Sequence, residues 1–146
     1  MPLLLSLIFF FCFVFYIYTG FYILTTKLRP GPQITFLCQC LSLSIWSFGF
    51  SIANSAPDYA TALFWHRIAA VGWSTFYSFF LHFALEQTEK IKVLKKKWTY
   101  VFLYAPALLN IFLFSVSDRF AVPRYNLSLT PLGWSVNPPV NLQEIY

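Results

Sequence analysis

The residues best suited to chemistry lie in the third of four apolar segments, between Tyr59 and Trp98. On a helix that turns about 100° per residue, four polar side chains of this segment fall within about 60° of a common line. They are Arg67, Ser74, Ser78 and His82. A polar stripe on an otherwise apolar helix should face the interior of a bundle rather than lipid. We therefore treat these four residues as candidates for contact with a ligand.

Two of these residues have a second interpretation. Arg67 could extend its guanidinium to nearby headgroups; if it is buried instead, it needs a partner such as Asp58 or an anionic ligand. His82 could simply be hydrogen-bonded at the membrane interface. His66 and His82 lie sixteen residues apart, about 24 Å along a helix, so they cannot hold one haem or one metal ion together.

No cofactor, metal site or catalytic centre is expected. The sequence holds no Walker loop, GxGxxG, HExxH or paired-carboxylate motif. Cys12, Cys38 and Cys40 all fall inside apolar segments. Cys38 and Cys40 point to nearly opposite sides of a helix, so buried thiols are expected rather than metal ligands.

Composition defines the class of protein. The chain has 146 residues, of which 58% are hydrophobic and 10% charged, whereas a soluble domain carries about 25% charged residues. The apolar residues form blocks close to the roughly 20 residues that a membrane span needs. We expect one all-α integral membrane domain over residues 1–146, a four-transmembrane-helix bundle. The expected spans are residues 3–25, 34–53, 62–85 and 98–116, with an external tail at 117–146.

Positive charges predict the orientation of the bundle. Lys27 and Arg29 follow the first span, and five lysines between residues 90 and 97 follow the third. Both loops should face the cytoplasm, which places the N-terminus outside. Because the net charge of +5 is concentrated beside apolar segments, the expected partner is the lipid bilayer and not nucleic acid.

Local sequence refines the bundle. Pro30-Gly31-Pro32 predicts a turn between the first two spans, and Pro106 predicts a kink in the fourth. β-prone residues from Arg119 to Leu129 and the turn-like residues 130–133 predict a short external β-hairpin. Small residues on one face of the second span predict close helix packing; they are Ser42, Gly49, Ala53 and Ala56.

Part of the third span resembles a known family. The run Ala62-Leu63-Phe64-Trp65-His66-Arg67-Ile68, followed by Gly72, is similar to the third helix of the N-terminal seven-transmembrane sensor region of bacterial histidine kinases. The same region also precedes GGDEF diguanylate cyclase domains. Tyr104-Ala105-Pro106 with Asn110, and Leu132-Gly133-Trp134, resemble later parts of it. The resemblance agrees with an external N-terminus and singles out Trp65 and Arg67.

The resemblance implies a sensory input module in a bacterial plasma membrane, responding to an unidentified small ligand. The chain would then be a fragment with four of the seven helices, and the missing C-terminal helices and a cytoplasmic output domain would be its partners. This chain would not itself be an enzyme, and a homodimer is a further expectation. A ligand or membrane stimulus would meet the outer half of the bundle near Arg67 and the external hairpin, and the kinked fourth helix would then shift against the third.

Two other functions remain open. Part of a small-molecule transporter should carry polar residues on several spans and an inverted repeat, whereas only the third span has a polar stripe. A membrane assembly protein would bind a partner and no small ligand.

Overall fold

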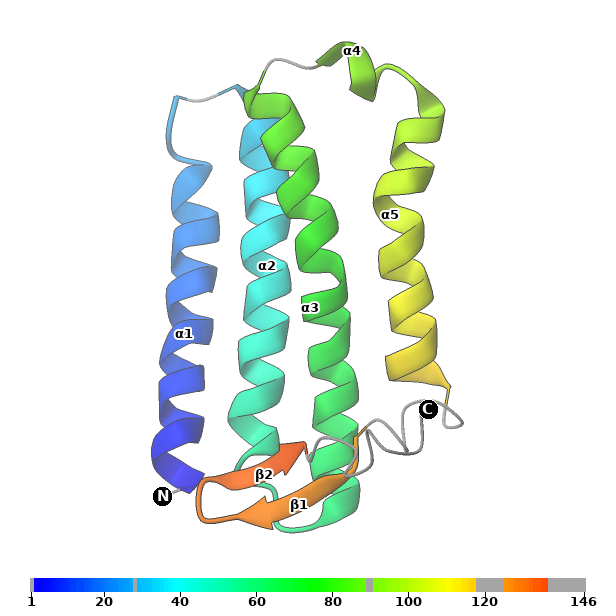
Figure 1. Cartoon of the computed structure of the whole chain (residues 1–146). Helices are drawn as coiled ribbons and strands as arrows, with labels where there is room; N and C mark the ends of the chain where they lie inside the picture. Colours follow the sequence, from blue (N-terminus) through cyan, green and yellow to red (C-terminus); the bar gives the residue numbers. More distant parts are fainter. Residues whose placement is uncertain (1, 28, 89–90, 118–124, 137–146) are drawn as a thin grey trace.

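The computed structural model describes residues 2–27, 29–88, 91–117 and 125–136. Four long helices stand side by side and are joined at alternate ends (Figure 1). The helices are α1 (Pro2–Ile23), α2 (Pro30–Ala53), α3 (Tyr59–Gln87), the short α4 (Ile91–Leu94) and α5 (Lys97–Ile111), which continues as the π-helix η1 (Phe112–Val116). The four long helices are long and apolar enough to cross a membrane. This confirms the all-α integral membrane bundle expected from the sequence.

The two ends of the bundle differ in composition. One end holds the α1–α2 loop and the exposed Lys95, Lys96 and Lys97, and we call it the lysine end. The opposite end holds the start of α1, the α2–α3 turn and two strands, and we call it the hairpin end (Figure 1). At 29 residues, α3 is about 43 Å long, which exceeds the roughly 30 Å of a bilayer's hydrocarbon core. The ends of α3 therefore extend toward both surfaces.

Local chemistry explains where α2 and α3 begin. Pro30 and Pro32 do not form the turn that the sequence suggested. They occupy the first turn of α2, where a missing backbone N–H is harmless and the fixed φ of proline suits a helix. Asp58 caps α3 by accepting bonds from the Thr61 backbone N–H at 2.8 Å and the Thr61 hydroxyl at 2.9 Å. The Thr61 backbone N–H lowers the pKa of the Asp58 carboxyl below its usual value.

The core of the bundle is built from small residues, and the large apolar side chains point outward. Ala53, Ala69 and Ala70 are fully buried, together with a series of serines on α2. By contrast, Phe11 on α1 is 68% exposed and Phe102 on α5 is 79% exposed. Lipid would cover these exposed rings, because helix interfaces in membranes favour small residues over bulky ones.

Close approach of α2 and α3 follows from two glycines. A Cβ added at Gly49 would lie 2.8 Å from the Cβ of Ala69, and one added at Gly72 would lie 2.5 Å from the Trp46 backbone N. Ser42, Gly49, Ala53 and Ala56 are all buried, and the first two lie against α3. This agrees with the close-packed face expected on the second span.

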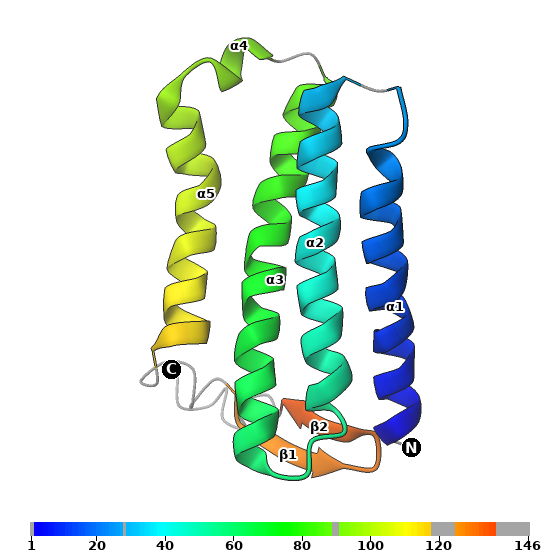
Figure 2. The same ribbon diagram turned by 180° about the vertical axis from the view of Figure 1, so that it is seen from behind.

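A β-hairpin crosses the ends of α1, α2 and α3 in both views (Figures 1 and 2). Strands β1 (Leu127–Thr130) and β2 (Gly133–Val136) pair antiparallel, which confirms the predicted hairpin. Gly133 has a φ of +115°, and a Cβ there would collide with the Asn54 carbonyl oxygen. The Trp134 indole N–H donates to the Ala56 carbonyl oxygen at 2.8 Å. The hairpin is thus fixed to the α2–α3 turn.

Two sequence expectations stay predictions. Pro106 lies inside α5 without ending the helix, and the kink there stays a prediction. Residues 118–124 and 137–146 of the expected external tail lie outside the described residues.

Candidate functional site

The polar stripe of α3 faces α5. The Ser78 hydroxyl donates to the Leu103 carbonyl oxygen at 2.6 Å, and the His82 Nδ1 lies 2.7 Å from the Tyr104 hydroxyl. Farther along, the Ser115 hydroxyl of η1 donates to the Arg67 carbonyl oxygen at 2.8 Å. We call these three contacts the polar seam. Ser78 and His82 therefore meet the fourth span through their side chains, whereas Arg67 meets it through its backbone carbonyl oxygen.

The relation to the polar seam differs among Trp65, Arg67 and Ser74. Ser74 is 3% exposed, and its hydroxyl has no hydrogen-bond partner among the described residues. Arg67 lies eight residues into α3, about 12 Å from its first residue, because α3 begins at Tyr59 rather than near residue 62. Asp58, the partner suggested for Arg67, bonds to Thr61 instead. Trp65 packs against Phe48 of α2, with ring centroids 5.5 Å apart, and does not join the seam.

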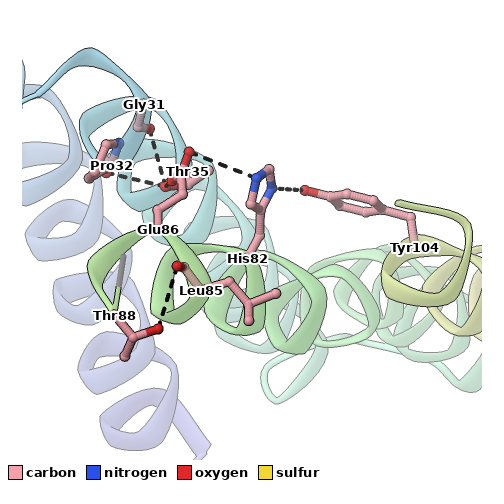
Figure 3. Close-up of polar contacts among 8 residues, drawn as sticks. All are labelled: Gly31, Pro32, Thr35, His82, Leu85, Glu86, Thr88 and Tyr104. Carbon is pink, nitrogen blue, oxygen red and sulfur yellow. Dashed lines mark hydrogen bonds and ion pairs between the residues drawn. The ribbon is translucent and has the colours of Figure 1, made fainter. Parts of the chain in front are cut away.

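At the lysine end, the contact of His82 with Tyr104 is part of a larger polar cluster that joins three helices (Figure 3). The Thr35 hydroxyl of α2 donates to Glu86 Oε2 at 2.6 Å. Glu86 Oε1 lies 3.8 Å from His82 Nε2, and the other nitrogen of that ring meets Tyr104 of α5. We call Thr35, His82, Glu86 and Tyr104 the lysine-end cluster. These contacts link α2, α3 and α5.

The two ring nitrogens of His82 face different partners: Nδ1 faces the Tyr104 hydroxyl and Nε2 faces the Glu86 carboxyl. Which nitrogen donates depends on the tautomer of the ring. The lysine-end cluster can exchange hydrogen-bond partners as the helices move. Its described residues include no nucleophile with an activating base.

Sequence reasoning missed Thr35, Glu86 and Tyr104 as members of this cluster. Glu86 could have been found, because it lies four residues after His82 and shares its helix face. Thr35 lies 51 residues from Glu86 in sequence, and no local pattern connects them. The pairing of α5 with α3 likewise depends on packing that no single helix encodes.

The same end carries a cavity of about 360 Å³ beside the cluster. Its lining brings two cations close to Glu86 and includes Arg29, Gly31, Glu86, Leu94, Lys95 and Tyr100. Among the described residues no group of three or more His, Cys, Asp or Glu side chains could hold a metal ion.

The fold and the polar seam define a class of protein. The four long helices form a multi-pass membrane bundle whose polar residues join neighbouring helices. The sequence matches the family model described as the N-terminal 7TM region of histidine kinase over residues 3–135. The chain belongs to this family. No curated protein and no solved structure matches it.

Family membership confirms the resemblance found in the third span. The N-terminal 7TM region is a non-catalytic input region, so the chain is part of a multi-pass membrane input module. The comparisons assign no ligand and no individual site residue.

Proposed function

We propose that the chain is the sensory input module of a histidine kinase in a bacterial plasma membrane. Its partners would be three further membrane helices and a cytoplasmic kinase domain, and its stimulus a small ligand that arrives at the hairpin end. The family match over residues 3–135 supports the input role. Phosphoryl transfer would belong to the kinase domain and not to this chain.

The proposed orientation places the hairpin end outside the cell. Lys27, Arg29 and the exposed Lys95 to Lys97 lie together at the lysine end. Positively charged loops are retained on the cytoplasmic side of a membrane. The α2–α3 turn at the opposite end carries Asp58 and no lysine or arginine.

The proposed mechanism is carried by the contrast between the two neighbours of α3. Gly49 and Gly72 bring the backbones of α2 and α3 into direct contact, so these two helices should move as one body. The contacts of α3 with α5 instead include the three hydrogen bonds of the polar seam. Hydroxyl and imidazole groups can exchange partners when a helix shifts by 1–2 Å, the usual amplitude of switching helices. A signal would therefore pass as a shift of α5 against the α2–α3 pair.

Substituting a serine of the seam tests this function. In the full-length kinase, reconstituted in lipid vesicles, Ser78→Ala removes the bond to Leu103 and should change the basal rate of autophosphorylation severalfold. Ser44→Ala is the matched control, because the buried Ser44 hydroxyl bonds only to Cys40 of its own helix, at 2.8 Å. If both variants keep the wild-type rate, α5 does not carry the signal through this seam.

Orientation is tested by labelling with a membrane-impermeant maleimide. Ser55→Cys at the hairpin end and Lys96→Cys at the lysine end place thiols at exposed positions. Intact cells should label Ser55→Cys alone, and permeabilised cells should label both. The wild-type chain serves as control, because Cys12, Cys38 and Cys40 lie within membrane helices. The opposite pattern would overturn the proposed orientation.

A further inference from the structure

A second cavity, of about 360 Å³, lies at the hairpin end. All of the first three helices and the hairpin contribute to its walls, which include Leu5, Phe9, Phe50, His66, Leu132 and Trp134. Its volume lies near the lower limit of the roughly 300–1,000 Å³ that small-molecule sites occupy. At about 30 Å³ for each water-sized group, it holds about twelve non-hydrogen atoms.

His66 is the unusual member of this wall. The residue is 2% exposed, and its Nε2 has no hydrogen-bond partner among the described residues. The ring is held between two aromatic side chains, with its centroid 4.9 Å from that of Phe50 and 5.7 Å from that of Tyr125. A buried polar atom without a partner calls for an explanation, and a bound group that shares a hydrogen bond with it is one such explanation.

Two neighbouring residues of the wall already use their donors. Asn54, 4% exposed, also lines the cavity, and its amide donates to the Phe50 carbonyl oxygen at 2.8 Å. Trp134 uses its indole N–H on Ala56. Among the buried polar atoms of the described lining residues, the His66 Nε2 is the one without a partner.

The wall also restricts the charge of a ligand. None of the described residues that line the cavity is an aspartate, glutamate, lysine or arginine. An ionised ligand would lose its hydration there without gaining a counter-ion, which is strongly unfavourable. A neutral molecule with an apolar body loses nothing comparable and gains contact with the aromatic and aliphatic walls.

We propose that this cavity binds a small neutral molecule, about the size of two fused aromatic rings, through one hydroxyl or N–H group that bonds to His66. The role of this molecule as a stimulus rests on the proposed sensor function. Its binding does not, because the described residues that line the cavity all lie between Leu5 and Val136 of this chain.

The probes for the test are 1-naphthol and naphthalene, which share one shape and differ by a hydroxyl that can donate or accept. Binding to the purified full-length protein in lipid nanodiscs is measured by calorimetry. One hydrogen bond should give 1-naphthol roughly a fivefold lower Kd than naphthalene. In His66→Phe, which keeps an aromatic ring between Phe50 and Tyr125, this preference should disappear while naphthalene still binds. In His66→Gln, whose amide can replace the ring nitrogen, part of the preference should return.

A second pair of variants separates the cavity from the surrounding lipid. Leu5→Trp fills the cavity from α1 and should weaken both probes at least tenfold. Leu4→Trp is the matched control on the lipid side, since Leu4 is 62% exposed, and should leave both Kd values unchanged. If Leu5→Trp binds like Leu4→Trp, or if His66→Phe keeps the preference for 1-naphthol, the proposed site is wrong.

The two proposals can fail separately. If the probes bind as expected but never alter autophosphorylation, the binding site stands and the sensor function loses support. If substitution at Ser78 changes autophosphorylation while no probe binds, the sensor function stands and the ligand site is refuted.

Discussion

Gly72→Ala is expected to separate the two helices that form the rigid part of the bundle. Gly72 lies on α3 where it crosses α2. An added Cβ would meet the Ser42 carbonyl oxygen, the Trp46 backbone N at 2.5 Å and the Trp46 Cβ at 2.9 Å. Two of these three atoms are backbone, and the third is attached directly to it. None of them can move aside by a side-chain rotation, so the helices themselves must part.

The size of the effect follows from these distances. Ordinary contacts begin at 3.4 Å, so the 2.5 Å approach to Trp46 N requires a separation of about 0.9 Å. Overpacking of this kind costs about 1–3 kcal/mol, and obstruction by backbone places Gly72→Ala at the upper end. Replacing glycine by alanine within a helix returns about 1 kcal/mol through helix propensity. The expected net loss is about 2 kcal/mol of unfolding free energy.

The assay is unfolding in mixed micelles by titration with SDS, followed by circular dichroism. Gly31→Ala is the matched control: its added Cβ would meet the Glu86 carboxyl, with Oε1 at 2.8 Å. This carboxyl is the end of a flexible side chain, and turning it away costs at most its hydrogen bond with Thr35, about 1 kcal/mol. Gly31→Ala should therefore unfold within about 1 kcal/mol of the wild type. If Gly72→Ala is as stable as Gly31→Ala, the glycine contact between α2 and α3 does not have the role argued for it.

Three further predictions concern single polar contacts. Tyr104→Phe removes the hydroxyl 2.7 Å from His82 Nδ1 and should lower the unfolding free energy by about 1 kcal/mol in the same titration; an unchanged transition would mean that water replaces the hydroxyl fully. Trp134→Phe removes the indole hydrogen bond that fixes the hairpin to the α2–α3 turn. Amide hydrogen exchange in β1 and β2 should therefore accelerate, while exchange in α2 stays slow. Equal exchange rates in the hairpins of the variant and the wild type would contradict this. The Thr61 N–H lowers the pKa of the Asp58 carboxyl in the folded protein. The carboxylate therefore caps α3 fully above the unfolded carboxyl pKa of about 3.9. This cap is lost as the pH falls through the lower pKa of the folded protein. Asp58→Asn should keep the cap and show a smaller decrease in melting temperature below about pH 4, whereas an identical decrease would exclude this carboxyl as a source of acid sensitivity.

The membrane helices could be predicted because their signal is local. Runs of apolar residues define the four spans, and the helices begin no more than four residues before the predicted starts. The small face on α2 was also readable, since 3.6-residue periodicity brings Ser42 and Gly49 to one side. Pro30-Gly31-Pro32 was misread because proline ends a helix from within but is well accepted in its first turn.

The candidate site could be predicted only on its own helix. Periodicity placed Ser78 and His82 on one face, and both do contact α5. Their partners Leu103 and Tyr104 could not be named, because the register between two helices depends on packing along their whole length. Trp65 and Arg67 are two residues apart, about 200° around a helix, and could never share a face. His66 was considered only as a possible metal ligand beside His82, and its burial under the hairpin depends on residues more than 50 positions away.

The positions of the two histidines on α3 limit how the ends of the bundle can communicate. His66 lies in the cavity wall at the hairpin end, and His82 lies in the lysine-end cluster, sixteen residues and about 24 Å farther along one helix. An α-helix locked to its neighbour by backbone contact at Gly49 and Gly72 does not bend readily between these points. A molecule bound beside His66 would therefore act on the lysine end by displacing α3 and α2 together. The polar seam holds α5 to α3 through hydrogen bonds that can exchange partners. The displacement of α2 and α3 would therefore be a movement relative to α5.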